Sequence, residues 1–286
     1  MTIEAAYDEC ERITREEARN FHYGIRLLAP PQRRSLCALY ALARLIDDIG
    51  DEDAPLAVKT AELEAVRARL GDLDNATDPV LVAVRDSAQH FPVPLEAFGE
   101  LIDGVETDLE GVHYDTFDEL TLYCRRVAGS IGRLCLSIFG NDADPRASLY
   151  ADQLGIALQQ TNILRDIRED LLIGRIYLPA HELERFGVEL RLDEHGALAD
   201  PDARLAEYIA FAAGRADHWY QLGERLLPHL DRRSAACCSA MAQIYHRLLL
   251  RIRENPTQVY DARLSLPALE KGRVAIGALS RAVLPR

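Results

Sequence analysis

The sequence lacks the features that mark several common classes of protein. Its 33 Lys and Arg are outnumbered by 46 Asp and Glu, which gives a formal net charge of −13, and no run rich in Lys or Arg occurs. Because nucleic-acid binding depends on neutralising phosphates, we expect no nucleic-acid partner. The longest strongly apolar stretch, residues 36–46, contains Arg44 and is shorter than the ~20 residues of a membrane-spanning helix. Neither a GxxxxGK[ST] loop nor a dinucleotide-binding glycine fingerprint occurs, so nucleotide hydrolysis and an obvious nicotinamide site have no support.

Signals for disulfides and export are missing too. The six cysteines form neither a CxxC motif nor a regular framework, which indicates reduced thiols. The N-terminal segment is acidic and does not have the basic end and apolar stretch of a signal peptide. We therefore expect a cytoplasmic protein, and peripheral contact with the inner face of the membrane stays open.

Helical periodicity dominates what is present. Apolar residues recur at three- and four-residue spacing over residues 36–46, 154–167 and 240–252, and alternating strand-like runs are nearly absent. An aspartate followed by proline, which predicts a helix N-cap with proline in the first turn, occurs at Asp78, Asp144 and Asp200. We predict an all-α protein in which residues 1–286 form a single domain.

A first group of polar residues interrupts the apolar helical pattern near residue 47. Residues four apart lie about 6 Å apart along one side of a helix, so a common face carries Tyr40, Arg44, Asp47 or Asp48, and Asp51. Three carboxylates are crowded together there. Taken alone, the group fits a solvated acidic helix end as well as a functional site, although aspartates are electrostatically unfavourable near a helix C-terminus.

A second group repeats this arrangement on another predicted helix. Asn162, Asp166 and Asp170 are successive i+4 neighbours and form one stripe of oxygen donors. Carboxylate and amide oxygens without paired His or Cys favour Mg²⁺, with Mn²⁺ as an alternative, over Zn²⁺. Such a metal turns an aspartate stripe into a phosphate site, and forked guanidinium donors at Arg165 and Arg175 suit diphosphate oxygens. The two stripes therefore predict a metal-bridged diphosphate, carried by an apolar substrate between apolar helices.

Two extended motifs resemble those of the squalene/phytoene synthase family of head-to-head prenyl-diphosphate condensing enzymes. The segment from Leu154 to Pro179 matches the family's second signature at every fixed position, and the segment from Tyr123 to Ile138 matches the first except at Ser130. Within the family, segments 20–28 and 262–267 are most similar to actinobacterial presqualene diphosphate synthases of hopanoid biosynthesis. The resemblance implies a single all-α isoprenoid-synthase domain, with helices around a central apolar cavity and two facing aspartate-rich motifs.

The resemblance also implies roles for individual residues. The metal-binding positions are Asp47, Asp48, Asp51, Asn162, Asp166 and Asp170. The catalytic positions, which grip or polarise the diphosphates or, at Tyr123, assist proton removal, are Tyr40, Arg44, Tyr123, Arg165 and Tyr245. The substrate-binding positions are Phe21, Ile25, Val127, Gln159, Arg175, Tyr177 and Arg263.

Some of these residue types have a simpler structural interpretation. Without the resemblance, Tyr123, Tyr177 and Tyr245 would be interpreted as packed core residues of amphipathic helices. Gly132 and Gly155 serve either close helix packing or close approach of an isoprenoid chain to the backbone.

The activity that the resemblance implies is a Mg²⁺-dependent condensation of two molecules of farnesyl diphosphate to presqualene diphosphate. The enzymatic alternatives are squalene synthase, which adds a hydride from NADPH, and dehydrosqualene or phytoene synthase, which releases a proton. NADPH is expected only for the full squalene synthase reaction, and downstream isoprenoid enzymes are candidate partners. A decayed homologue that acts as an assembly or binding protein is the non-enzymatic alternative, against which both intact aspartate motifs argue.

Overall fold

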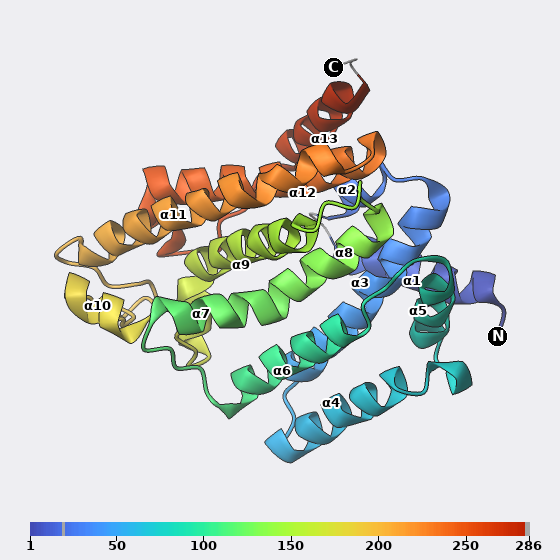
Figure 1. Ribbon diagram of the computed structural model, residues 1–286. Coiled ribbons are helices and arrows are strands. Elements are labelled where there is room, and N and C mark those ends of the chain that lie inside the picture. The colour runs from blue at the N-terminus through green and yellow to red at the C-terminus, as the bar shows by residue number, and fades with distance from the viewer. Residues whose placement is uncertain (19–20, 284–286) are drawn as a thin grey trace.

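Helices account for nearly all regular secondary structure in the computed structural model, which describes residues 1–18 and 21–283 (Figure 1). Apart from one isolated bridge between Leu192 and Leu198, these residues form no strand pairing, so the all-α prediction is confirmed. Asn20, which belongs to the segment 20–28 used above, lies outside the described residues. The α-helices are α1 (Ile3–Glu17), α2 (His22–Ile25), α3 (Pro30–Asp51), α4 (Leu56–Leu70), α5 (Pro79–His90), α6 (Glu96–Glu110), α7 (Phe117–Cys124), α8 (Ser130–Phe139), α9 (Ala147–Leu172), α10 (Ala180–Phe186), α11 (Arg204–Gly223), α12 (Arg232–Glu254) and α13 (Ala268–Val283). Shorter turns are η1 (Leu73–Asn75), η2 (Arg125–Gly129), η3 (Glu224–His229) and η4 (Pro256–Val259).

Helix α9 lies at the centre of the fold. It is 26 residues long, and Figure 1 shows it between α8 on one side and α11 and α12 on the other, each of which it contacts. Its buried residues occur on several sides of the helix, as a helix surrounded by neighbours requires. Helix α3 packs against α1, α5, α6 and α8. The two helices that carry the polar motifs therefore belong to the framework of the protein.

The three predicted N-caps differ in outcome. Asp78 caps α5 as predicted, because its carboxylate accepts from the backbone N–H groups of Val80 and Leu81 at 2.9 and 3.3 Å. Asp144 does not cap α9, which begins at Ala147; its carboxylate accepts instead from the N–H of Arg146. The carboxylate of Asp200 accepts from the N–H groups of Leu205 and Ala206, each at 3.0 Å, while the helix begins at Arg204, beyond Pro201. Proline therefore takes the predicted first-turn position in only one of the three cases.

The π-turn η2 joins α7 to α8 and was not predicted from the periodicity. Such turns are rare and often lie at functional sites. Arg125 of η2 donates to Asp152 of α9 at 3.1 Å, and Arg133 of α8 donates to Asp152 and to Glu100 of α6, each at 2.8 Å. These partly buried ion pairs link α6, α8 and α9 around the turn.

Glycines let the helices beside the π-turn touch at the backbone. A Cβ added to Gly132 would lie 2.4 Å from the carbonyl oxygen of Ala151, and one added to Gly155 would lie 2.3 Å from the carbonyl oxygen of Ala128. Both distances are far below van der Waals contact, so these positions require glycine for helix packing.

Most of the interior belongs to one continuous hydrophobic cluster with contributions from most of the helices, and a small second cluster of Ala240, Ala275 and Ala278 joins α12 to α13. All six cysteines are free thiols. Within the described part of the chain, no helix has both the length and the apolar composition needed to cross a membrane.

Candidate active site

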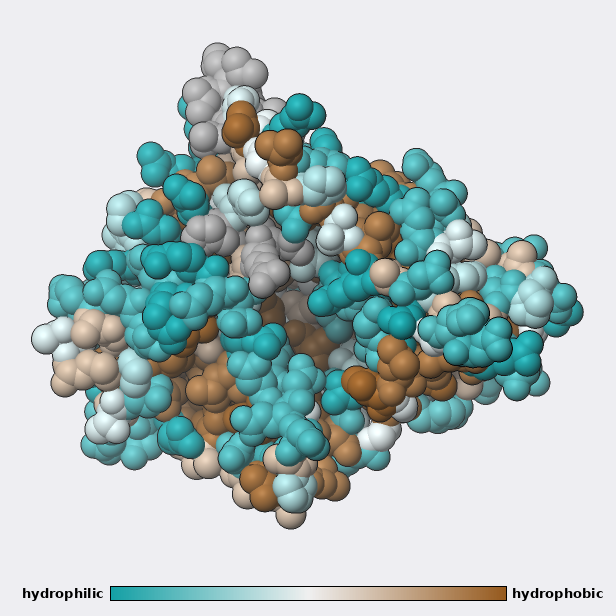
Figure 2. All heavy atoms as spheres, turned by 180° about the vertical axis from the view of Figure 1, so that it is seen from behind, coloured by the Kyte–Doolittle hydropathy of each residue, from teal (hydrophilic) through white to brown (hydrophobic). Residues whose placement is uncertain are grey.

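A cavity of about 890 Å³ opens between the helices that carry the two polar motifs. In Figure 2 the molecule is hollowed on one face, with hydrophobic residues in the depth and hydrophilic residues along much of the rim. Helix α3 shows how far the cavity extends, because both Asp47 and Leu36 line it. These residues are eleven positions apart, which corresponds to about 16 Å along a helix. The cavity is therefore elongated, with a polar mouth and apolar walls that include Leu134, Phe139 and Met241.

The structure brings most of the predicted site residues to this cavity. Those that line it are Phe21, Ile25, Tyr40, Arg44, Asp47, Val127, Gln159, Asn162, Arg165, Tyr245 and Arg263. Those that do not line it are Asp48, Asp51, Tyr123, Asp166, Asp170, Arg175 and Tyr177. Contacts with lining residues connect part of this second set to the cavity: Arg263 and Arg165 donate to Asp166, and Arg44 pairs with Asp48. Within the second set, Arg175 lies 3.4 Å from Asp51.

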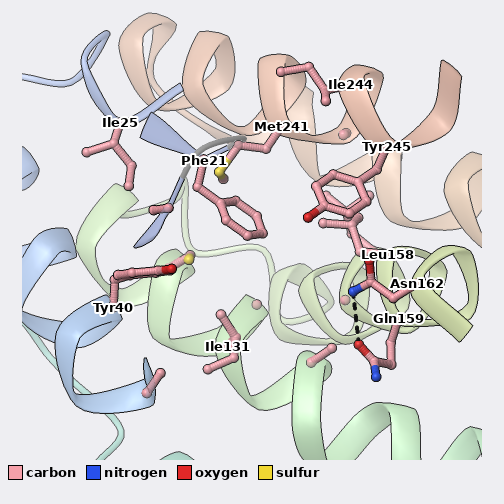
Figure 3. Close-up of a pocket in the computed structure, with 18 of the residues that line it drawn as sticks. Phe21, Ile25, Tyr40, Ile131, Leu158, Gln159, Asn162, Met241, Ile244 and Tyr245 are labelled. Carbon is pink, nitrogen blue, oxygen red and sulfur yellow. Dashed lines mark hydrogen bonds between the residues drawn. The ribbon is translucent and has the colours of Figure 1, made fainter. Parts of the chain in front are cut away.

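Aromatic rings form one side of the cavity (Figure 3). Phe21, in the segment that leads into α2, packs its ring against Tyr245 of α12 and Tyr40 of α3, with centroid separations of 5.6 and 6.4 Å. Figure 3 shows these rings together with Ile131 and Leu158 around the cavity. Tyr40 and Tyr245 each combine an apolar ring with a polar hydroxyl, which suits the border between an apolar chain and a polar head group.

The first acidic motif lies at the C-terminal end of α3. Arg44 and Asp48 form an i,i+4 ion pair, with 2.5 Å between Nη2 and Oδ1, and the Nε of Arg44 is buried without a hydrogen-bond partner. The side chain of Asp47 is accessible from the mouth. Enclosure by the surrounding protein and repulsion from Asp51 and Asp48 nevertheless raise its pKa to about 7, against the attraction of Arg44. The motif is thus a crowded acidic group with arginine beside it.

The second acidic motif lies on α9. Asp166 accepts hydrogen bonds from Arg165 and, at 2.9 and 3.0 Å, from Arg263. Burial and the negative charge of Asp166 raise the pKa of Asp170 to about 7. The side chain of Asn162 donates to Gln159 at 3.2 Å, while its own carbonyl oxygen is buried without a partner.

The donor set of these two motifs fits Mg²⁺. The carbonyl oxygen of Asn162 has no hydrogen-bond partner, and the carboxyls of Asp47 and Asp170 have raised pKa values. A hard cation would stabilise all three groups. Within residues 1–18 and 21–283, no three Asp, Glu, His or Cys side chains already converge on one point. Mg²⁺ is usually held by one or two carboxylates, completed by water and substrate phosphates, so such a cluster is not required.

A buried group of tyrosines lies beyond the mouth. Tyr123 of α7 is 5% exposed, and the rings of Tyr177 and Tyr114 pack against it at centroid separations of 5.2 and 5.5 Å. Its hydroxyl donates to Asp108 of α6 at 2.9 Å. Burial, more than any other cause, raises the pKa of Asp108 to about 6. The packed-core interpretation of Tyr123 and Tyr177 is therefore correct as far as burial is concerned, and Asp108 gives Tyr123 a charged partner.

Asp108 is a hydrogen-bond partner of the predicted site residue Tyr123 that the sequence analysis missed. Its position carried a signal, because α6 buries an apolar face that includes Leu101 and Val105. Asp108 follows these residues at helical spacing and so places a carboxyl on the buried face. A buried acid needs a partner, and only the structure identifies that partner as Tyr123.

Comparisons with known proteins identify the family to which the chain belongs. The profile of the family described as squalene/phytoene synthase matches residues 14–270. The phytoene synthases of Mycobacterium tuberculosis and Mycobacterium bovis are each 57% identical to the chain over 281 residues, which cover 98% of this chain and 93% of each relative. The crystal structure of a dehydrosqualene synthase in complex with a ligand matches with a TM-score of 0.86 and 25% identity, over 98% of this chain and 97% of that chain.

These relatives correct one prediction. Similarity to presqualene diphosphate synthases predicted farnesyl diphosphate as substrate and presqualene diphosphate, a hopanoid precursor, as product. That prediction is wrong, because two relatives that share 57% of their residues with the chain over almost its full length are phytoene synthases. The family assignment itself is confirmed by the profile match and by the isoprenoid-synthase fold. The chain is a head-to-head prenyltransferase that belongs to the squalene/phytoene synthase family.

Proposed function

We propose that the protein is a Mg²⁺-dependent phytoene synthase, which condenses two molecules of geranylgeranyl diphosphate head to head. The observation that carries this proposal is the 57% identity to two phytoene synthases over 98% of the chain. Dehydrosqualene synthase, the name of the solved structure, is less well supported because the identity there is 25%. Release of protons rather than addition of a hydride completes the proposed reaction, so NADPH is not required.

The cavity suits a long apolar chain that ends in a diphosphate. Its volume of about 890 Å³ lies near the upper end of the ~300–1,000 Å³ typical of ligand pockets. The chain would lie along α3, with its end among apolar residues such as Leu36 and Phe139 and its diphosphate at Arg44 and Asp47. Burial of the apolar chain would contribute roughly 25 cal/mol per Å² of its surface.

The arginines at the mouth would bind the diphosphate oxygens. Arg165 is 6% exposed and is held by Asp166, so its guanidinium has little freedom to reorient. Arg263 lies on the exposed segment before α13 and reaches the same carboxylate. Arg44 lies on α3, the helix that carries the first acidic motif, and also lines the cavity. Forked donors from these three side chains would stabilise the charge that develops on a leaving diphosphate.

Mg²⁺, when bound, would add Lewis-acid stabilisation of the leaving group. The residues that would hold it are Asp47, Asp48, Asp51, Asn162, Asp166 and Asp170. The apolar walls would keep water away from the allylic cation that remains after the diphosphate departs. Tyr123 would assist removal of the protons that the condensation releases.

Product analysis tests this proposal. The purified enzyme would be incubated with Mg²⁺ and geranylgeranyl diphosphate, without NADPH, and the hydrocarbon product would be identified by mass spectrometry against authentic phytoene. We expect phytoene. Release of only geranylgeraniol, or a requirement for NADPH before any hydrocarbon forms, would contradict the proposal.

A further inference from the structure

The contact between Asp108 and Tyr123 is more specific than core packing requires. Tyr177 and Tyr114 pack against the ring of Tyr123, and the hydroxyl of Tyr123 donates to one carboxylate oxygen of Asp108 at 2.9 Å. The other oxygen of that carboxylate is buried and has no hydrogen-bond partner. The side chain of Tyr177 also acts on this carboxyl through a hydrogen bond that lowers its pKa. A buried carboxylate with one oxygen left unpaired is still costly to the fold, so its presence here calls for a functional explanation.

The surroundings of Asp108 place this pair between the two acidic motifs. The charged groups that act on the Asp108 carboxyl include Arg175, which lowers its pKa, and Asp51, which raises it. Asp108 in turn acts on Asp170. Asp51 belongs to the first motif and Asp170 to the second, and Arg175 lies 3.4 Å from Asp51. The carboxyl to which the Tyr123 hydroxyl donates therefore lies within electrostatic range of both acidic motifs.

Tyr123 needs a partner if it is to remove a proton. Burial and the neighbouring carboxylate of Asp108 raise the pKa of its phenol, so the neutral form is strongly favoured. A neutral phenol accepts a proton only if its own proton leaves at the same time. The hydrogen bond from Tyr123 to Asp108 provides the path for that departure.

We propose that Asp108 is a positioning residue that acts through Tyr123, fixing its hydroxyl and taking up the hydroxyl proton as Tyr123 accepts one from the bound isoprenoid. This inference rests on the proposed function, in which carbon-bound protons are lost. The C–H bond of the isoprenoid breaks and its electron pair forms the new carbon–carbon bond. The released proton binds to the Tyr123 oxygen, and the original hydroxyl proton moves to Asp108, which becomes a neutral carboxylic acid until it returns the proton to solvent.

Burial prepares Asp108 for this role. It raises the pKa of the Asp108 carboxyl to about 6, so the carboxylate is a stronger base than an ordinary aspartate and is still ionised at neutral pH. A residue that only satisfied the hydroxyl of Tyr123 would not need a charge, because a neutral amide oxygen accepts the same hydrogen bond.

A double-mutant cycle tests the proposal. Asp108→Asn keeps the size of the side chain and an acceptor oxygen but cannot take up a proton, and Tyr123→Phe removes the hydroxyl. We expect each variant to lower kcat by about 10²-fold with little change in KM. The double variant should be no slower than the slower single variant, because both changes interrupt one relay. Multiplied effects in the double variant, or full kcat in Asp108→Asn, would overturn the proposal.

Controls separate this result from simple loss of structure. Asp103→Asn changes another aspartate of α6, one whose carboxylate pairs with Arg67 at 2.9 Å and is 46% exposed, and it should keep wild-type kcat. Circular dichroism would show whether each variant is folded. If Asp108→Asn proves unstable, Asp108→Glu provides a second test: it retains a carboxylate and should therefore be more active than Asp108→Asn. Lower activity in Asp108→Glu than in Asp108→Asn would contradict the relay. If the wild-type enzyme forms a different head-to-head product, the phytoene proposal fails, and the cycle is measured on that product.

Discussion

Replacing Gly155 by alanine should destabilise the protein, whereas the same replacement at Gly214 should not. Both glycines lie inside long helices, Gly155 in α9 and Gly214 in α11. A Cβ at Gly155 would lie 2.3 Å from the carbonyl oxygen and 2.6 Å from the carbonyl carbon of Ala128, whereas a Cβ at Gly214 would meet nothing within 4 Å. Because the atoms near Gly155 belong to the backbone, no side-chain rotation can relieve the clash.

The magnitude follows from two opposing contributions. Alanine is favoured over glycine inside a helix by about 1 kcal/mol, and this gain applies at both positions. Overpacking of a tight interior costs about 1–3 kcal/mol or more, and a contact this short with backbone belongs at the upper end of that range. We expect a net loss of roughly 2 kcal/mol for Gly155→Ala and a gain of up to about 1 kcal/mol for Gly214→Ala.

Thermal unfolding followed by circular dichroism measures both effects. A change of 1 kcal/mol shifts Tm by about 2–4 °C in a protein of this size class, so the two variants should differ in Tm by about 5 °C or more, with opposite signs relative to wild type. Gly155→Ala with unchanged or raised Tm would refute the helix-packing explanation. A normal Tm with a raised KM for the substrate would instead indicate that Gly155 makes room for the isoprenoid chain, because Gly155 also lines the cavity.

Two further predictions concern the acidic motifs. Asp166→Asn should lower kcat by at least ~100-fold, because several kcal/mol of charge stabilisation at the diphosphate would be lost, while circular dichroism stays unchanged; full turnover in excess EDTA would show that no metal is needed. The folded state raises the pKa of the Asp170 carboxyl to about 7, so between about pH 4 and about pH 7 it binds more protons than the unfolded state. The contribution of Asp170 to the stability of the metal-free protein should therefore fall as the pH rises through this range. Asp170→Asn, measured in EDTA by differential scanning fluorimetry, should therefore raise Tm relative to wild type at pH 8 and lose this advantage near pH 5; a Tm difference that is the same at both pH values would contradict this explanation.

The parts of the site that depend on spacing within one helix could be predicted from the sequence. The i+4 spacing of Arg44 and Asp48, and of Asn162, Asp166 and Asp170, fixes which side chains share a face. The structure places Arg44 and Asn162 at the cavity, with Asp48 paired to Arg44 and Asp166 paired to Arg263. The apolar periodicity likewise predicted α3, α9 and α12, because a helix must bury its apolar side.

Features that depend on a distant partner could not be predicted in this way. The π-turn η2 is held by Glu100 and Asp152, which lie 25 or more residues away from Arg125 in the sequence. The predicted N-cap at Asp144 was wrong because its carboxylate accepts hydrogen bonds from the backbone and side chain of Arg146 rather than from the first turn of α9. Asp108 was missed because its importance comes from Tyr123 on the next helix. The predicted prenyl chain length was wrong because it rested on the similarity of segments 20–28 and 262–267 to presqualene diphosphate synthases, whereas nearly the whole chain is 57% identical to phytoene synthases.

Competition between two prenyl diphosphates tests the central claim most directly. The enzyme would be given equimolar farnesyl and geranylgeranyl diphosphate with Mg²⁺ and without NADPH, and the hydrocarbons would be quantified to give the ratio of kcat/KM. We predict that phytoene dominates and that kcat/KM for geranylgeranyl diphosphate is higher by ~10-fold or more, since one isoprene unit adds several carbons of apolar contact. A higher kcat/KM for farnesyl diphosphate, with dehydrosqualene or presqualene diphosphate as the main product, would contradict the assignment.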